Sequence, residues 1–172
     1  MVLVVTPGAT DADSYASLAE ADAYLALVGG AWSGTNSDKE MALRRATAWI
    51  DATYEGRWGG WRKNGRDQAL SWPRYGVYDA EGFVVAFDTI PAEIRNATCQ
   101  AAARELAKPG ALAPDVVSGT IARRKKVGPL EVEYAGSGGA YEMVPTLTVV
   151  DGILARLLTN ATGGGSVDLL RV

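Results

Sequence analysis

The chain of 172 residues contains no histidine and only one cysteine, Cys99. Without histidine there is no Ser-His or Cys-His nucleophile and no histidine ligand for a metal ion. A single cysteine excludes a disulfide within the chain and is typical of a reducing compartment. No pair of carboxylates stands in a context that predicts perturbed pKa values. We therefore expect no enzymatic activity, no catalytic residue, no metal site and no cofactor.

Long apolar runs and an excess of positive charge are also missing. No apolar stretch approaches the roughly 20 residues of a membrane helix. The short apolar run after Met1 lacks the basic start and cleavage pattern of a signal peptide. The formal net charge is −3 and the isoelectric point is near 5.0. We expect no membrane contact, and the acidic balance argues against a general nucleic-acid-binding domain, which is usually basic.

The residues that are present predict a mainly α-helical fold, a bundle of about four helices with an inserted β-hairpin and an extended C-terminal arm. Ser17 and Glu20 have the spacing of a capping box, and Ser37 and Glu40 repeat it. Pro91 is tolerated in the first turn of a third helix. A last helix opens near 145 and has leucines on one side. The expected helices cover residues 18–28, 37–54, 91–108 and 145–158.

The inserted hairpin is expected at about 119–135. Residues 130–134 alternate strictly between apolar and charged side chains, which predicts a half-buried strand, and 121–127 can pair with it. The first strand carries a basic run made of Arg123, Arg124, Lys125 and Lys126. The second strand carries Glu131 and Glu133. The basic run could bind a nucleic acid, or it could form charge pairs across the hairpin.

The stretch from Tyr54 to Tyr78 combines aromatic and basic residues with glycine, proline and asparagine, which interrupt regular structure. Trp, Tyr and Arg anchor protein interfaces, and they also stack on unpaired bases and hold phosphates. Tryptophan rings inside the subunit would be unable to stack on bases, so their exposure separates the two hypotheses. The candidate contacts to another subunit or partner are Arg57, Trp58, Trp61, Arg62, Arg66, Trp72, Arg74 and Tyr75. Of these, Trp58, Trp61, Trp72 and Arg74 could instead anchor contacts within the loop.

The end of the sequence predicts a short arm. We expect residues 1–158 to form one domain, followed at 159–172 by a flexible polar and glycine-rich linker and an apolar peptide. Such a peptide can add to a sheet edge or fill a groove on a partner; fraying or folding back is the alternative. The apolar residues of the arm are Val167, Leu169, Leu170 and Val172.

Three segments together resemble a known family. They are SYASLAEADAYLA at 14–26, ALRRATAWIDATYEGRWGGWRKNGRDQALSWPRYGVYDAEG at 42–82, and IPAEIRNATCQAAAREL at 90–106. The basic hairpin and the last helix complete the pattern, which covers most of residues 14–158. The sequence is similar to the head–tail adaptor (connector, or head-completion) proteins of long-tailed bacteriophages, which are often labelled as similar to the DnaT-type single-stranded-DNA-binding protein.

The resemblance implies a structural virion protein. Its subunits would form a dodecameric ring at the neck that joins the portal to the next neck or tail protein, a stopper or tail terminator. The arm at 166–172 would reach the portal. The ring would surround the double-stranded genome without sequence-specific binding, and the protein would be made in the cytoplasm of the host bacterium. The alternative is a single-stranded-DNA-binding module that uses the aromatic and basic loop.

Overall fold

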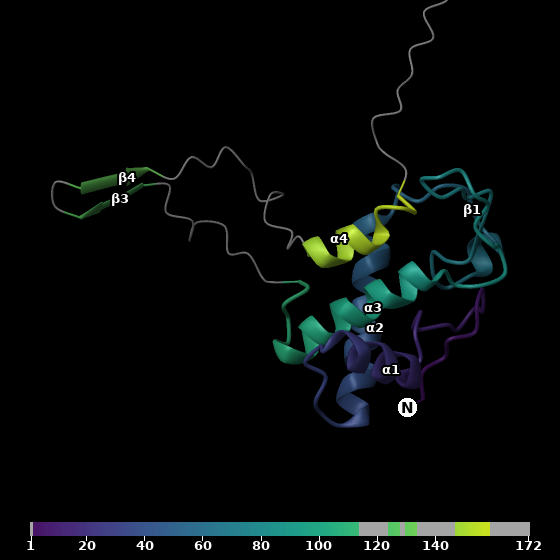
Figure 1. Cartoon of the computed structure of the whole chain (residues 1–172), viewed down its shortest axis with the longest axis horizontal. Helices are drawn as coiled ribbons and strands as arrows, with labels where there is room; N and C mark the ends of the chain where they lie inside the picture. The colour runs from purple at the N-terminus through teal and green to yellow at the C-terminus, as the bar shows by residue number, and fades with distance from the viewer. Residues whose placement is uncertain (1, 114–123, 128–129, 134–146, 159–172) are drawn as a thin grey trace, which may run out of the picture.

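A computed structural model describes residues 2–113, 124–127, 130–133 and 147–158. Its order of helices and strands confirms a mainly α-helical fold with a small hairpin. Figure 1 shows the helices gathered together, with the segment around β1 at one end of them. The C-terminal arm lies outside the described residues.

The first helix, α1 (Leu18–Val28), begins where the sequence predicts. The Ser17 side chain accepts a hydrogen bond from the Glu20 backbone, and the Glu20 carboxylate accepts one from the Ser17 N–H at 2.8 Å. Gly29 ends the helix with a φ of 70°, in the left-handed region that glycine adopts at little cost. The predicted capping box is therefore confirmed.

The second helix, α2 (Asn36–Tyr54), begins earlier than predicted. Its N-cap is Thr35, whose side chain accepts from the Asp38 N–H at 3.2 Å, while Asp38 accepts from the Thr35 hydroxyl at 2.7 Å. The predicted box of Ser37 and Glu40 is therefore corrected by two residues. Both pairs have the three-residue spacing, and the chain uses the earlier one because Thr35 has the extended backbone of a cap.

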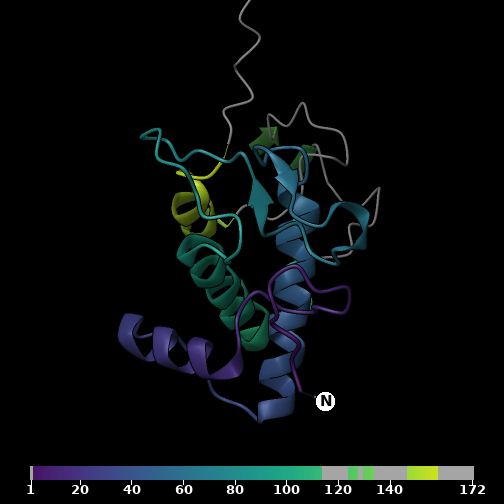
Figure 2. The ribbon, with the colours of Figure 1, turned by 90° about the vertical axis from the view of Figure 1, so that its right-hand side faces the viewer.

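The remaining helices are α3 (Ala92–Ala107) and α4 (Thr148–Leu154). Helix α3 packs against the other three, most extensively against α2. Figure 2 shows α2 upright beside α3, with α1 crossing below and α4 above. Three alanines of α3, Ala97, Ala101 and Ala102, are fully buried, which allows close approach between helices. The described part of the last helix is shorter than predicted, and the expected start near 145 lies outside the described residues.

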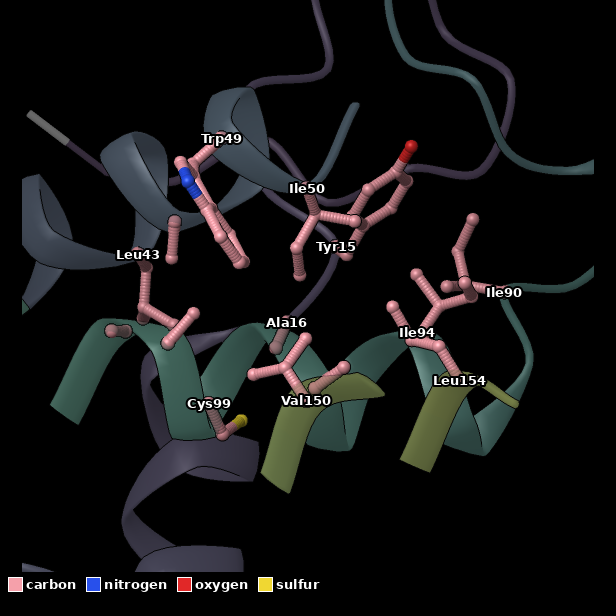
Figure 3. Packing of buried hydrophobic residues seen from close by; sticks show 14 of the residues in the cluster. Tyr15, Ala16, Leu43, Trp49, Ile50, Ile90, Ile94, Cys99, Val150 and Leu154 are labelled. Carbon is pink, nitrogen blue, oxygen red and sulfur yellow. The ribbon is translucent and has the colours of Figure 1, made fainter. Parts of the chain in front are cut away.

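The core is a single cluster formed by all four helices and the lead-in to α1 (Figure 3). Leu43 and Ile50 from α2, Ile94 from α3 and Leu154 from α4 belong to this cluster, each with 0% exposure. Trp49 and Cys99 are also buried in this cluster. Because α4 contributes to this cluster, the chain closes its core only near residue 157.

The loop after α2 is compact, although it contains little regular structure. Two short strands, β1 (Trp61–Arg62) and β2 (Arg74–Tyr75), pair antiparallel around a 3₁₀ turn, η1 (Gly65–Asp67). The chain then folds back at 79–82, and a bridge pairs Tyr78 with Val84. The apolar run 83–87 forms no named strand and is mostly exposed.

The predicted hairpin is confirmed in β3 (Arg124–Val127) and β4 (Leu130–Glu133). Its antiparallel register places Arg124 opposite Glu133 and Lys126 opposite Glu131. The register therefore sets basic positions of β3 opposite acidic positions of β4, the arrangement that charge pairing across the strands requires. Arg123 lies outside the described residues.

Candidate interaction surface

Two tryptophans of the candidate site lie inside the subunit. Trp58 is 6% exposed and Trp72 1%, and their rings meet edge to face with centroids 5.6 Å apart. Tyr54 joins them at 5.6 Å from Trp58. Neither indole N–H has a hydrogen-bond partner among the described residues, so both rings act through packing. The expectation that Trp58 and Trp72 belong to an outer contact surface is therefore corrected, because the fold buries them.

Arg74 is also buried, and its side chain joins separate parts of the loop by hydrogen bonds. Its guanidinium donates to the carbonyl oxygens of Gly59 at 2.7 Å, Gly60 at 2.9 Å and Ser71 at 3.2 Å. Burial lowers the pKa of Arg74 from its usual value. Gly60 has a φ of 61°, and a Cβ there would lie 1.8 Å from the Tyr75 carbonyl oxygen. Arg74 is thus corrected from an interface residue to an internal clamp on a turn that requires glycine.

Asp51, in the last turn of α2, anchors the same loop through hydrogen bonds. Asp51 accepts a hydrogen bond from the Tyr15 hydroxyl and another from the Ser71 N–H at 3.0 Å. The Trp72 N–H in turn donates to the Tyr15 oxygen at 3.2 Å. Burial raises the pKa of Asp51, although the hydrogen bonds from Tyr15 and Ser71 oppose it, and burial also raises the pKa of Tyr15. Sequence reasoning missed both residues, because nothing in their local pattern shows a distant partner.

Gln68 completes the internal support and was also missed. It is 2% exposed, and its side-chain amide donates to the carbonyl oxygens of Leu70 at 2.7 Å and Pro73 at 3.1 Å. Asn64 extends the support to the N-terminal segment, donating to the Gly8 carbonyl oxygen at 2.8 Å. The loop is therefore held by the subunit's own hydrogen bonds.

Outside this support the loop carries a group of exposed apolar side chains, which we call the aromatic ribbon. Tyr75 stacks on Phe87 with centroids 4.6 Å apart, and Trp61 is paired with Tyr75 across β1 and β2. Tyr78 and Val84 are paired farther along. Large exposed apolar groups on one piece of backbone mark an interaction site. The ribbon comprises Trp61, Tyr75, Tyr78, Phe83, Val84 and Phe87, each between 42% and 74% exposed.

The charges around the ribbon are balanced. Lys63 lies 5.8 Å from the centre of the Phe87 ring, and Arg62 pairs with Glu55 at 3.6 Å. The Arg57 guanidinium lies 5.3 Å from the Tyr54 ring, and Arg66 is exposed in η1. Residues 54–90 contain five basic and five acidic side chains. The ribbon thus lacks the one-sided positive field that usually accompanies nucleic-acid binding.

Other expected features do not add to this surface. The arm residues Val167, Leu169, Leu170 and Val172 lie outside the described residues, as does the linker before them. Within the described ranges, no group of three side chains of the types that ligate metals is close enough to hold an ion. No helix in that part of the chain has the length and apolar character needed to span a membrane.

Comparison with known proteins gives one match. No curated protein and no solved structure matches the chain. A family model described as "Putative DnaT-like ssDNA binding protein" matches residues 1–172, the whole length of the sequence. The chain therefore belongs to the DnaT-like family that this description names.

Proposed function

We propose that the chain is a structural subunit that binds other proteins through the aromatic ribbon, as a head–tail adaptor of a tailed bacteriophage. The observation that carries the proposal is the exposed group of Trp61, Tyr75 and Phe87 on a loop that the subunit itself holds rigid. Aromatic side chains in such a setting supply binding energy with little loss of conformational freedom on association. The kind of assembly that we propose is the one that the sequence resemblance implies.

In this assembly the subunit forms a dodecameric ring between the portal and the next neck or tail protein. A ring uses heterologous contacts, in which the ribbon of one subunit meets a different face of its neighbour. An acidic protein around the channel lets the DNA genome pass without adhering. The place of action is then the neck of the virion, after synthesis in the host cytoplasm.

Binding of single-stranded DNA is the second candidate, and the family description favours it. Trp58 and Trp72 are too deeply buried to stack on bases. The residues left for this role are Trp61, Tyr75 and Phe87, with Lys63 beside them to contact a phosphate. The balanced charge of residues 54–90 favours the protein interface over this candidate.

Two measurements on the purified chain separate the candidates. Light scattering gives the mass of the protein alone and mixed with a cognate portal protein. A titration with fluorescent oligothymidine at low and high salt gives its affinity for single-stranded DNA. An adaptor forms a ring or joins the portal and ignores the oligonucleotide. A DNA-binding module binds the oligonucleotide with an affinity that falls steeply with salt.

The variant Trp61→Ala tests whether the ribbon is the contact surface. Trp61 is 74% exposed, so the variant keeps the fold, and we expect it to lose ring or portal association. The matched control is Leu27→Ala, an apolar residue of α1 that is 87% exposed. If Trp61→Ala assembles as well as the control, the ribbon is not the interface. If it instead loses salt-sensitive oligonucleotide binding, the second candidate is correct.

A further inference from the structure

The described chain ends beside one end of the aromatic ribbon. The Ala80 N–H donates to the Arg156 carbonyl oxygen at 2.8 Å, and Arg156 forms an ion pair with Glu81. Leu158, the last described residue, is bridged to Trp58. The turn at 79–82 therefore lies next to the end of the described chain.

That turn presents apolar side chains on a fixed backbone. The Asp79 carboxylate accepts hydrogen bonds from the N–H groups of Glu81 and Phe83, each at 2.9 Å. The exposed fractions are 61% for Tyr78, 67% for Phe83 and 70% for Val84. Tyr78 and Val84, which the bridge pairs, and the neighbouring Phe83 thus present exposed apolar side chains close to the last described residue.

We propose that residues 167–172 of the same chain dock on Tyr78, Phe83 and Val84. Eight residues, 159–166, separate Leu158 from Val167, and when extended they span at most about 26–29 Å. The turn is held to Arg156 directly, so it lies well within this reach. Val167, Leu169, Leu170 and Val172 supply apolar side chains that the turn can cover.

We expect the docking segment to come from the same chain, because the tether keeps it at a high local concentration near the turn. A short connection holds a tethered peptide at an effective concentration of about 1 mM near its site, far above the about 10 μM at which a purified protein is studied. The turn is also a different part of the ribbon from Trp61, Tyr75 and Phe87. The docking therefore stands whether or not those three residues bind a partner.

The test is disulfide trapping in the full chain. The variant Val84→Cys/Leu169→Cys places one thiol on the turn and one in the segment, and a disulfide forms only when their Cα atoms come within about 7 Å. The matched control is Val149→Cys/Leu169→Cys, because Val149 is also exposed, at 58%, and lies on α4 just before the exit. Native Cys99 stays in place, since it is buried and its pKa is raised to about 12.

We expect the Val84 pair to form an intrachain disulfide about tenfold faster than the Val149 pair, as a docking free energy of about 1.4 kcal/mol would give. Adding Tyr78→Ser and Phe83→Ser should reduce the rate to that of the control, and both positions are exposed enough to change without unfolding the chain. Equal rates for the two pairs would overturn the proposal. So would disulfides that form only between chains, which non-reducing gels distinguish by mass.

Discussion

Trp72 and Trp61 belong to the same loop, and burial separates their roles. Trp72 is 1% exposed and Trp61 is 74% exposed. Removal of a large buried aromatic ring leaves a cavity as well as losing its transfer free energy. We expect Trp72→Ala to lower the free energy of unfolding by about 3–5 kcal/mol, and Trp61→Ala to change it by no more than about 0.5 kcal/mol. Urea denaturation of both variants measures the difference.

A similar loss in both variants would contradict this division. Trp72→Phe provides a milder variant if Trp72→Ala fails to fold, because it keeps most of the apolar volume and should lose less stability than alanine. If Trp72→Ala had normal stability but failed to assemble, Trp72 would have to be assigned to an interface between subunits.

Because of Cys99, we expect the free energy of unfolding to depend on pH in the alkaline range. Burial, with a smaller effect from Glu20, raises the pKa of its thiol from 9.0 to about 12. Because the folded pKa is the higher one, the stabilisation is complete below pH 9 and is lost as the pH rises to about 12. We expect the free energy of unfolding to fall by at most about 1.4 kcal/mol per pH unit for this group. Denaturant titrations at several pH values measure the fall.

The variant Cys99→Ala isolates this effect. Between pH 9 and 10 the fall in its free energy of unfolding should be shallower than that of the native chain. Above pH 10 both proteins should lose stability, since burial raises the pKa values of Tyr15 and Tyr54 above their usual 10.0. Identical slopes between pH 9 and 10 would show that Cys99 does not titrate as proposed.

Residue types in the loop could be predicted from the sequence, but their surroundings could not. Trp, Arg and Tyr in a segment rich in glycine indicate a site or a packed loop. The choice depends on Asp51 and Gln68, whose partners lie 20 and five residues away along the chain. Such contacts follow from the fold as a whole. Local pattern therefore found Trp61 and Tyr75 as exposed candidates without separating them from Trp72.

At the scale of helices, capping patterns predicted the start of α1 correctly and that of α2 two residues late. Thr35-x-x-Asp38 and Ser37-x-x-Glu40 have the same spacing, so sequence alone does not choose between them. The helix begins at the earlier pair because Thr35 and Asp38 satisfy N–H groups two residues earlier.

This choice has a measurable consequence. Thr35→Ala removes the hydroxyl that accepts from the Asp38 N–H, so it should lower the free energy of unfolding by about 0.5–2 kcal/mol. Ser37→Ala is the matched control within the first turn, and we expect a change of no more than about 0.5 kcal/mol. Thermal denaturation of the two variants compares them directly. A larger loss for Ser37→Ala would restore the predicted cap.

Across the whole molecule, the core is closed by the last described helix. Val150, Leu154 and Leu157 are each at most 3% exposed, and the Tyr54 hydroxyl donates to Asp151 at 2.6 Å. Burial of three aliphatic side chains contributes about 1.5–3 kcal/mol each. Their sum is comparable to the 5–15 kcal/mol that stabilises a typical domain. The segment 147–158 is thus expected to be essential for folding, although 39 residues separate it from the end of α3 at Ala107.

Two truncations test where the folded unit ends. A chain of residues 1–158 keeps every residue of the core cluster, so we expect cooperative unfolding with a midpoint close to that of the full chain. A chain of residues 1–146 exposes the side of α3 on which α4 packs, and we expect it to lose cooperative unfolding in circular dichroism and calorimetry. If 1–158 also lost cooperativity, residues after 158 would belong to the folded core, and the proposed division into a domain and an arm would be wrong. If 1–146 unfolded cooperatively near the native midpoint, α4 would be an addition to a core that α1, α2 and α3 complete alone.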